Sequence, residues 1–294
     1  MATLLRNLVI LVYICSLKFR DMSTYNETKR TKVTTATLLE MKRNGEKIAA
    51  LTSYDYTMAS IVDAAGVDFI LVGDSASNVM LGNETTLPIT LDDMITFAKG
   101  VVRGARRAFV VVDLPFGTYQ GDALQAYHSA VRVMRETGAA AVKLEGGKEI
   151  LPSIEKILSA GIPVVGHLGL TPQSINKFGG YGLRAKEDAE AQRLIDDAHL
   201  LDDAGVCAIV LEKVPSALAA RVTREVSVPV IGIGAGSEVD GQILVVQDML
   251  GMNKAFKPKF VRRFADVEEA MTKGLTAYVD AVKTVDFPNS GEQY

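Results

Sequence analysis

The pattern of hydrophobic and polar residues predicts a series of short, deeply buried strands. Continuous apolar runs alternate along the chain with segments whose apolar residues recur at helical spacing. Strands that are apolar throughout are typical of a parallel sheet covered by helices. We predict strands at residues 48–52, 69–72, 109–112, 141–144, 163–167, 207–211, 228–232 and 241–246.

Helices are predicted between most of these strands, and several should end at a glycine that adopts the left-handed backbone conformation. These glycines are Gly66, Gly138, Gly161 and Gly205. Thr90 and Asp93 resemble a capping box for the helix after the second strand. Ser216 is expected to cap the helix before the seventh strand. Residues 75–88 and 168–186 lack an apolar period, and we predict long loops there, as candidates for the active site.

Eight strands that alternate with helices allow two architectures, an open doubly wound sheet or a closed barrel. We favour a TIM (β/α)8 barrel, because acidic residues at the strand ends would lie too far apart along an open sheet. The chain of 294 residues is long enough for one such domain of about 250 residues. The barrel is predicted to cover residues 35–294, including a C-terminal helix near residues 267–279 and a polar tail.

Residues 1–34 are predicted to form an N-terminal extension that is disordered or lies upstream of the true start. Residues 7–15 are apolar but too few to span a bilayer comfortably, and no small-residue cleavage site follows them. We interpret residues 1–21 as an upstream extension of a protein that starts at Met22. A membrane anchor, a cleaved leader and a structured arm remain alternatives.

Composition narrows the class of protein. The net charge of -3 argues against a broad nucleic-acid-binding face. The two cysteines, Cys15 and Cys207, are far apart and support neither a disulfide framework nor a cysteine-based zinc site. We therefore expect a cytoplasmic protein without nucleic-acid or membrane partners.

Acidic residues stand where four of the predicted strands end, namely Asp74, Asp113, Glu145 and Glu212. The carboxyl ends of the strands are where barrel enzymes carry their active sites. The carboxylates of Asp74, Asp113 and Glu145 come from successive strands and suit Mg²⁺, which prefers oxygen ligands. The alternative for each acid is a helix cap or a surface ion pair.

Lys143 lies two residues before Glu145, so both side chains point into the barrel. It could pair with Glu145, bind a substrate carboxylate or form a Schiff base, although acidic neighbours would disfavour the last role. His167 ends the fifth strand and is either a core histidine or part of the site. Glu212 follows an apolar strand, where loss of water would make it a stronger general base. The glycines of residues 232–236 have the wrong spacing for a dinucleotide fingerprint and indicate backbone crowding or a loop over the substrate.

Several motifs resemble those of the ketopantoate hydroxymethyltransferase family, in order, from about residue 33 to 265. They are Val72-Gly73-Asp74-Ser75, Thr86-Leu87-Pro88-Ile89-Thr90, Asp113-Leu114-Pro115-Phe116, Val142-Lys143-Leu144-Glu145-Gly146-Gly147, Gly166-His167-Leu168-Gly169-Leu170-Thr171-Pro172-Gln173-Ser174 and Ile231-Gly232-Ile233-Gly234-Ala235-Gly236. Many members read Leu-Gly-Met where this chain has Ala76-Ser77-Asn78, a departure that bears on the shape of the pocket.

This resemblance implies a cytoplasmic, Mg²⁺-dependent TIM barrel in pantothenate biosynthesis. Such enzymes transfer a one-carbon unit from 5,10-methylenetetrahydrofolate to 3-methyl-2-oxobutanoate, giving 2-dehydropantoate, and assemble as homodecamers. By match of motif, Asp74 and Asp113 would bind the metal and the substrate, with Glu145 at the metal. Ser75 and Lys143 would bind the oxo acid, and His167 would lie behind these groups. Glu212 would be the catalytic base.

Two other functions are compatible with a barrel of this kind. A lyase that splits a 2-methylcitrate-type acid shares the enolate chemistry, but usually relies on a catalytic cysteine in a mobile loop. Cys207 is predicted to open a strand at the opposite end of the barrel. A non-catalytic barrel would need the acids to be structural, and loss of metal binding in the intact protein would favour it.

Overall fold

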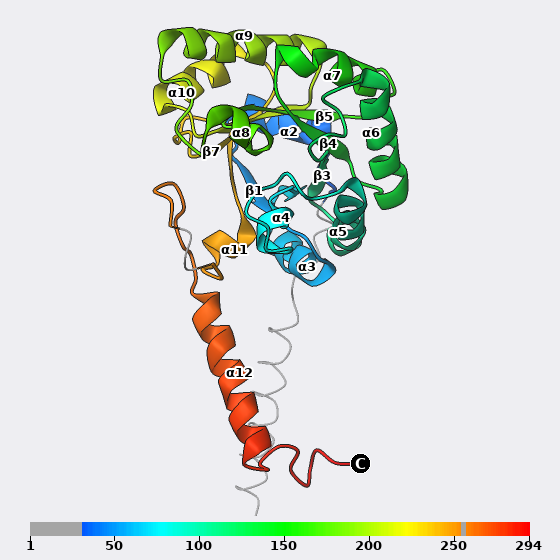
Figure 1. The fold of residues 1–294 in the computed structure, drawn as a ribbon, viewed down its shortest axis with the longest axis vertical. Coiled ribbons are helices and arrows are strands. Elements are labelled where there is room, and N and C mark those ends of the chain that lie inside the picture. Colours follow the sequence, from blue (N-terminus) through cyan, green and yellow to red (C-terminus); the bar gives the residue numbers. More distant parts are fainter. Residues whose placement is uncertain (1–30, 254–256) are drawn as a thin grey trace, which may run out of the picture. The chain divides into compact units, whose positions relative to one another are not determined.

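The computed structural model describes residues 31–253 and 257–294, and the barrel belongs to a compact unit, Val33–Tyr294. Eight parallel strands close into a barrel in chain order (Figure 1). They are β1 (Ile48–Thr52), β2 (Phe69–Val72), β3 (Phe109–Asp113), β4 (Ala141–Glu145), β5 (Val164–Gly169), β6 (Ala208–Glu212), β7 (Val230–Ile233) and β8 (Gly241–Leu244). The predicted TIM (β/α)8 fold is confirmed.

Helices connect the strands and cover the outside of the barrel. The longer helices are α2 (Thr35–Arg43), α3 (Tyr56–Ala64), α5 (Leu91–Gly104), α6 (Ala123–Thr137), α7 (Leu151–Leu158), α9 (Asp188–Ala204), α10 (Ser216–Glu225) and α12 (Val267–Lys283). Thr90 and Asp93 form the predicted capping box of α5. Gly138 and Gly205 end α6 and α9 in the left-handed conformation, as expected.

Some local predictions were wrong because tertiary contacts decide these segments. Residues 75–88 contain a short helix, α4 (Ala76–Val79), and residues 168–186 contain η2 (Pro172–Ser174) and α8 (Ile175–Phe178). The last strand ends at Leu244, and α11 (Val246–Met249) begins where we expected strand residues. Ser216 is the first residue of α10 and does not cap it.

The hydrophobic core has two layers. The larger layer lies between the strands and the surrounding helices. The smaller layer fills the barrel interior, where Leu38 and Met41 of α2 pack with the inward side chains of the strands. Val33 belongs to this layer and its backbone N–H donates to the Arg107 carbonyl, so the barrel unit begins before the predicted residue 35. The predictions for residues 1–30 lie outside the described residues.

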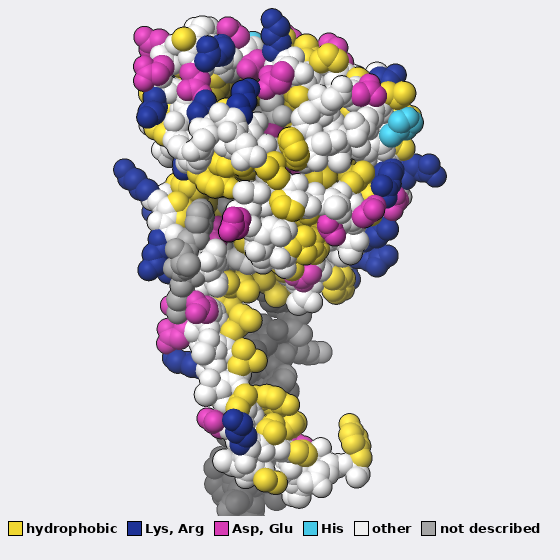
Figure 2. All heavy atoms as spheres, viewed as in Figure 1, with side chains coloured by type: hydrophobic (Ala, Val, Ile, Leu, Met, Phe, Trp, Pro, Cys, Tyr) yellow, Lys and Arg dark blue, Asp and Glu magenta, His cyan; other side chains and the backbone are white. Residues whose placement is uncertain are grey.

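The helix α12 has none of its residues buried, although its sequence is amphipathic. Figure 2 shows hydrophobic side chains gathered along it. The large apolar side chains exposed on it are Met271, Leu275, Tyr278, Val279 and Val282. In the described part of the chain, no helix is both long and apolar enough to cross a membrane.

The barrel closes through close backbone contact between β1 and β8, where Ile48 pairs with Gly241. A Cβ atom on Gly241 would lie 2.5 Å from the Ile48 carbonyl oxygen. We predict that Gly241→Ala lowers the free energy of unfolding by about 1–3 kcal/mol, measured by urea denaturation. Gly121→Ala is the control, since its added Cβ would have no neighbour within 4 Å. Equal stability of the two variants would contradict this account of closure.

Candidate active site

A cavity of about 470 Å³ opens at the carboxyl end of the barrel. The strands β2 to β6 bring the predicted polar residues to its wall, although these residues are spread along the sequence from Asp74 to Glu212. The lining includes Asp74, Ser75, Asp113, Lys143, Glu145, His167 and Glu212. The structure therefore unites all the residues that sequence analysis singled out for the site.

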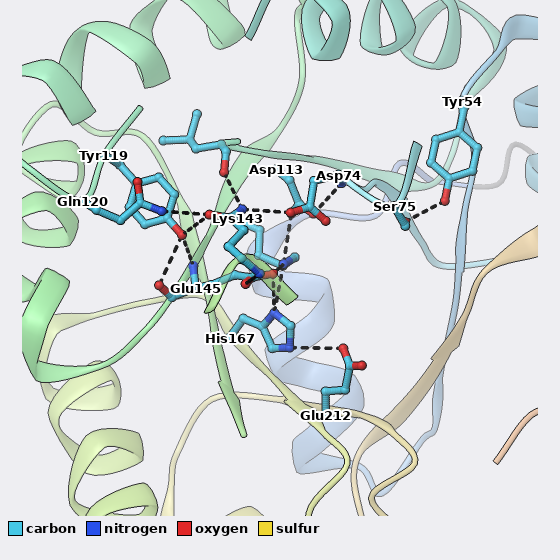
Figure 3. A network of polar contacts seen from close by, with 12 residues as sticks. Tyr54, Asp74, Ser75, Asp113, Tyr119, Gln120, Lys143, Glu145, His167 and Glu212 are labelled. Atoms are coloured by element: carbon cyan, nitrogen blue, oxygen red, sulfur yellow. Dashed lines mark hydrogen bonds and ion pairs between the residues drawn. The ribbon is translucent and has the colours of Figure 1, made fainter. Parts of the chain in front are cut away.

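Lys143 stands at the centre of the polar network (Figure 3). Its Nζ lies 3.2 Å from Asp113 Oδ1, 3.6 Å from Glu145 Oε1 and 3.1 Å from His167 Nδ1. Burial disfavours the ammonium form, but the charges of Asp113 and Glu145 outweigh it and raise the pKa of Lys143. A Schiff-base role needs a lowered pKa, so this environment argues against it.

Asp74 and Asp113 lie side by side at the ends of β2 and β3. The Asp74 backbone N–H donates to Asp113 Oδ2 at 3.0 Å, while Gln173 Nε2 donates to Asp74 Oδ2 at 2.9 Å. Burial, with the charge of Glu145 second, raises the pKa of Asp74 to about 7. Burial likewise raises the pKa of Asp113 to about 8, despite the opposing charge of Lys143. These carboxyl groups are short of positive charge.

Glu145 is held from several sides. The Gln173 backbone N–H donates to its Oε2 at 2.9 Å, and His167 Nδ1 lies 3.2 Å from its Oε1. The Tyr119 hydroxyl contacts the Glu145 backbone and the Gln173 side chain. Sequence reasoning missed Gln173 and Tyr119 as site residues. Gln173 lies within a motif quoted for the resemblance, but no pattern distinguished it from its neighbours.

His167 connects the Lys143 cluster to Glu212. Its Nε2 lies 3.5 Å from Glu212 Oε2, and both ring nitrogens are buried within the site. Burial, reinforced by the charge of Lys143, lowers the pKa of His167 to about 4, so the ring is neutral at pH 7. The two contacts of Nδ1 favour opposite tautomers, because the Lys143 ammonium can only donate to it, whereas the ionised Glu145 carboxylate can only accept from it.

Glu212 is less enclosed than its apolar strand suggested. Its side chain is 16% exposed, compared with 2% for Asp113 and Glu145. It therefore faces the open part of the cavity, whereas the other two acids lie behind it in the protein. This position lets Glu212 reach a ligand while His167 restrains it.

Ser75 begins the connection after β2, and its hydroxyl contacts the Tyr54 hydroxyl at 2.8 Å. Ala76, Ser77 and Asn78, where the sequence departs from the motif that it otherwise resembles, form the start of α4. Ser77 donates to the Thr85 carbonyl at 2.7 Å, which ties α4 to the loop after it. Asn78 lines the cavity together with Asp74 and Ser75.

The oxygen ligands in the cavity fit Mg²⁺ only in part. Within the described residues, no three His, Cys, Asp or Glu side chains are grouped to hold one ion, so the expected set of Asp74, Asp113 and Glu145 is not formed. Glu145 is instead engaged by His167 and Gln173. Asp74 and Asp113 still fit, because Mg²⁺ commonly uses one or two carboxylates together with waters and substrate oxygens. The buried Asp113 Oδ1 makes no hydrogen bond, although Lys143 lies nearby.

The glycines after β7 lie where the backbone is crowded. Crowding was one of the two explanations that the sequence suggested for them. A Cβ atom on Gly236 would lie 2.5 Å from the Ser216 side chain, and one on Gly234 would meet the Phe260 ring at 3.2 Å. Gly234 also has a positive φ of 63°, which favours glycine. This loop therefore supports the cavity wall through close packing.

A closed (β/α)8 barrel with buried acids and a lysine at the carboxyl ends of its strands has the architecture of a barrel enzyme. The family model described as ketopantoate hydroxymethyltransferase matches residues 32–290. The chain belongs to the ketopantoate hydroxymethyltransferase family.

Similar proteins agree with this assignment. The 3-methyl-2-oxobutanoate hydroxymethyltransferase of Bacteroides fragilis is 63% identical over 273 residues, which cover 93% of this chain and 100% of that protein. The protein of the same name from Flavobacterium johnsoniae is 64% identical, and the match covers 90% of this chain and 97% of that protein. Among solved structures, that of 2,3-dimethylmalate lyase has a TM-score of 0.54 at 16% identity. The match covers 85% of this chain and 98% of that chain, which shows a shared fold.

The raised pKa values predict how stability depends on pH in the metal-free protein. The folded state binds the protons of Asp74 and Asp113 more tightly than the unfolded chain, whose Asp groups titrate near 3.8. The stability that these protons supply is present at low pH and lost as pH rises through about 7 and 8. We predict that Asp113→Asn flattens the fall in unfolding free energy between about pH 4 and pH 8.

Asp203→Asn, at an exposed position, is the matched control and should keep the wild-type pH profile. Calorimetric titration of the same proteins with Mg²⁺ should show weaker binding only in Asp113→Asn, because that change removes a charged oxygen ligand. An unchanged Mg²⁺ titration in Asp113→Asn would remove this residue from the proposed metal site.

Proposed function

We propose that the protein transfers a one-carbon unit from 5,10-methylenetetrahydrofolate to 3-methyl-2-oxobutanoate, giving 2-dehydropantoate in cytoplasmic pantothenate biosynthesis. Support comes from membership of the ketopantoate hydroxymethyltransferase family and from relatives that bear the name of this activity. The observation that carries the proposal is the cavity, in which a partly exposed carboxylate stands beside a buried lysine and two carboxylates.

The reaction balances as follows. A base removes the C3 proton of the oxo acid, and C3 forms a bond to the methylene carbon. Both bonds from that carbon to the folate nitrogens N5 and N10 break, and water supplies the hydroxyl oxygen. The two nitrogens take up the C3 proton and one proton from the water. Tetrahydrofolate and 2-dehydropantoate leave. The protein must therefore bind the carboxylate and keto group, hold the developing negative charge, and receive one proton.

The polar end of the cavity is suited to binding the oxo acid. Lys143 keeps a positive charge there, opposite the substrate carboxylate, and its ion pairs with Asp113 and Glu145 fix its position. The Ser75 hydroxyl, oriented by Tyr54, can donate a hydrogen bond to the same group. Fixed donors of this kind orient a substrate without reorganisation during the reaction.

Asp74 and Asp113 would hold Mg²⁺, and Glu145 would lie behind them. When bound, the ion supplies positive charge for the oxygen atoms of the oxo acid, a contribution of several kcal/mol in metalloenzymes. The protein prepares this place with two buried carboxylates whose charge Lys143 offsets only in part. Gln173 keeps Asp74 oriented through its amide donor.

Glu212 would act as the base that receives the C3 proton. It is the acid of the cluster with the most exposed side chain, so it can approach a substrate carbon. Neutral His167 lies 3.5 Å away and limits the positions that the carboxylate can take. After the carbon–carbon bond has formed, the same carboxylate returns this proton towards a folate nitrogen, which needs it before tetrahydrofolate can leave.

We also propose that the protein is a homo-oligomer, a decamer by family resemblance. The apolar side chains exposed along α12 support self-association, because burying them would be favourable. The lyase alternative gains no support from Cys207. This residue precedes β6 at the amino end, and burial raises the pKa of its thiol to about 12.

The activity predicts a defined product. Incubation with Mg²⁺, 5,10-methylenetetrahydrofolate and 3-methyl-2-oxobutanoate should give 2-dehydropantoate, detected by mass spectrometry. Omitting the oxo acid is the control. If no product forms from protein that binds both substrates, the proposed function is wrong.

The assigned base predicts a half-reaction that does not need the folate. In D₂O with Mg²⁺, the wild type should exchange the C3 proton of 3-methyl-2-oxobutanoate for deuterium, followed by NMR. Glu212→Gln keeps the size of the side chain but cannot accept a proton, so exchange should fall roughly 10²–10⁴-fold. Binding of the oxo acid should change little. Exchange at the wild-type rate in this variant would remove Glu212 from the role of base.

A further inference from the structure

The cavity is larger than the oxo acid requires. Its volume is about 470 Å³. The oxo acid has about eight non-hydrogen atoms and would fill no more than roughly 240 Å³, even at the roughly 30 Å³ that a water molecule occupies in the liquid. About half of the space therefore remains for a second ligand.

The two halves of the cavity differ in chemistry. The side formed by β2 to β5 carries the charged cluster around Lys143. The opposite side, formed by β6 to β8 and the segments after β8, is mainly apolar, although Glu212, Lys213, Asp248 and Asn253 also line it. Its lining includes Val210, Ile233, Ile243, Leu244, Val245, Phe260 and Val261. An apolar wall opposite a charged one suits a ligand with a flat ring system beside the oxo acid.

Asp248 interrupts this apolar side. It belongs to α11, lines the cavity and is 6% exposed. Its Oδ1 lies 3.4 Å from Asn253 Nδ2, a long hydrogen bond, and burial raises its pKa. The start of α11 is anchored to the barrel, because the Val246 backbone N–H donates to Thr52 Oγ1 at 3.1 Å. The carboxylate is therefore held in a fixed, largely water-excluded place.

Among the described lining residues after β6, Asp248 is the one acid. Glu84, on the loop after α4, also lines the cavity but is exposed to solvent. A buried carboxylate is costly unless it is compensated. The long bond from Asn253 and the charge of Arg263 offset the burial of Asp248 only in part, because its pKa remains raised. This position suits a flat, mainly apolar ligand that donates hydrogen bonds to the carboxylate.

We propose that Asp248 binds the pyrimidine edge of the pterin ring of the folate co-substrate, through the 2-amino group and N3–H. These two donors point in parallel and match the two oxygens of one carboxylate. The apolar side chains of Val245 and Phe260 line the same half and offer surfaces to the ring faces. Phe260 is held in place because it packs over Gly234. This inference rests on the proposed function and names the residue that selects its folate.

The test uses 5-formyltetrahydrofolate, a stable analogue, and its counterpart in which a methyl group replaces the 2-amino group. Binding to the full protein is measured by calorimetry for the wild type, Asp248→Asn and the control Glu84→Gln. Asp248→Asn should weaken binding of the first analogue about 10- to 100-fold, the range expected for hydrogen bonds to a charged group. Glu84→Gln should bind as the wild type does.

The second analogue separates recognition from a structural role. The wild type should bind it about 10- to 100-fold more weakly than the first, because the carboxylate loses a donor. Asp248→Asn should discriminate much less between the two analogues. Equal discrimination by the wild type and Asp248→Asn would overturn the inference, as would equal losses of affinity in Asp248→Asn and Glu84→Gln.

Proton exchange in D₂O distinguishes this inference from the proposed function. Asp248→Asn should exchange the C3 proton at the wild-type rate, because that half-reaction needs no folate. Loss of exchange in Asp248→Asn would overturn the inference by showing that Asp248 supports the whole site. If the wild type forms product while Asp248→Asn keeps its folate affinity, the inference alone fails. If the wild type exchanges the proton but forms no product, the proposed function fails.

Discussion

The active site depends on one buried ammonium group among three buried carboxylates. Lys143 neutralises part of the charge of Asp113 and Glu145, and Asp74 lies in the same cluster. One positive charge cannot satisfy three acids, so burial raises the pKa of Asp74 and Asp113. The cluster favours additional positive charge, from protons or a cation. Without that charge, the excess of carboxylates would oppose negative charge that develops on a substrate.

The barrel makes this cluster possible because its strand register brings distant residues into line. Asp113 pairs with Lys143 across β3 and β4, and Glu145 pairs with His167 across β4 and β5. Gln173, from the segment after β5, then joins Asp74 and Glu145 through its side chain and backbone. A rigid parallel sheet therefore fixes groups whose mutual repulsion would separate them on a flexible chain.

The cavity has a charged half and an apolar half, and each half suits a different ligand. In the proposed reaction, the charged half would bind the oxo acid. Glu212 stands between the halves, with His167 Nε2 3.5 Å from its Oε2. The apolar half carries one buried carboxylate, Asp248, on a helix tied to the barrel through Thr52. In the proposed reaction, this arrangement would bring a donor of one carbon and its acceptor together at Glu212.

The sequence by itself determined the barrel, its strands and the acids at the strand ends, because these follow from local patterns. Because each of four apolar runs stops at a carboxylate, the four acids lie at one rim of a parallel barrel, independently of the loop conformations. These acids are Asp74, Asp113, Glu145 and Glu212. Only the tertiary structure decided the end of β8, the short helices after β2, β5 and β8, the contacts of Gln173 and the burial of Asp248. Gln173 meets Asp74 across 99 residues of sequence, and Asp248 is buried by the cavity wall, so no local period could reveal either.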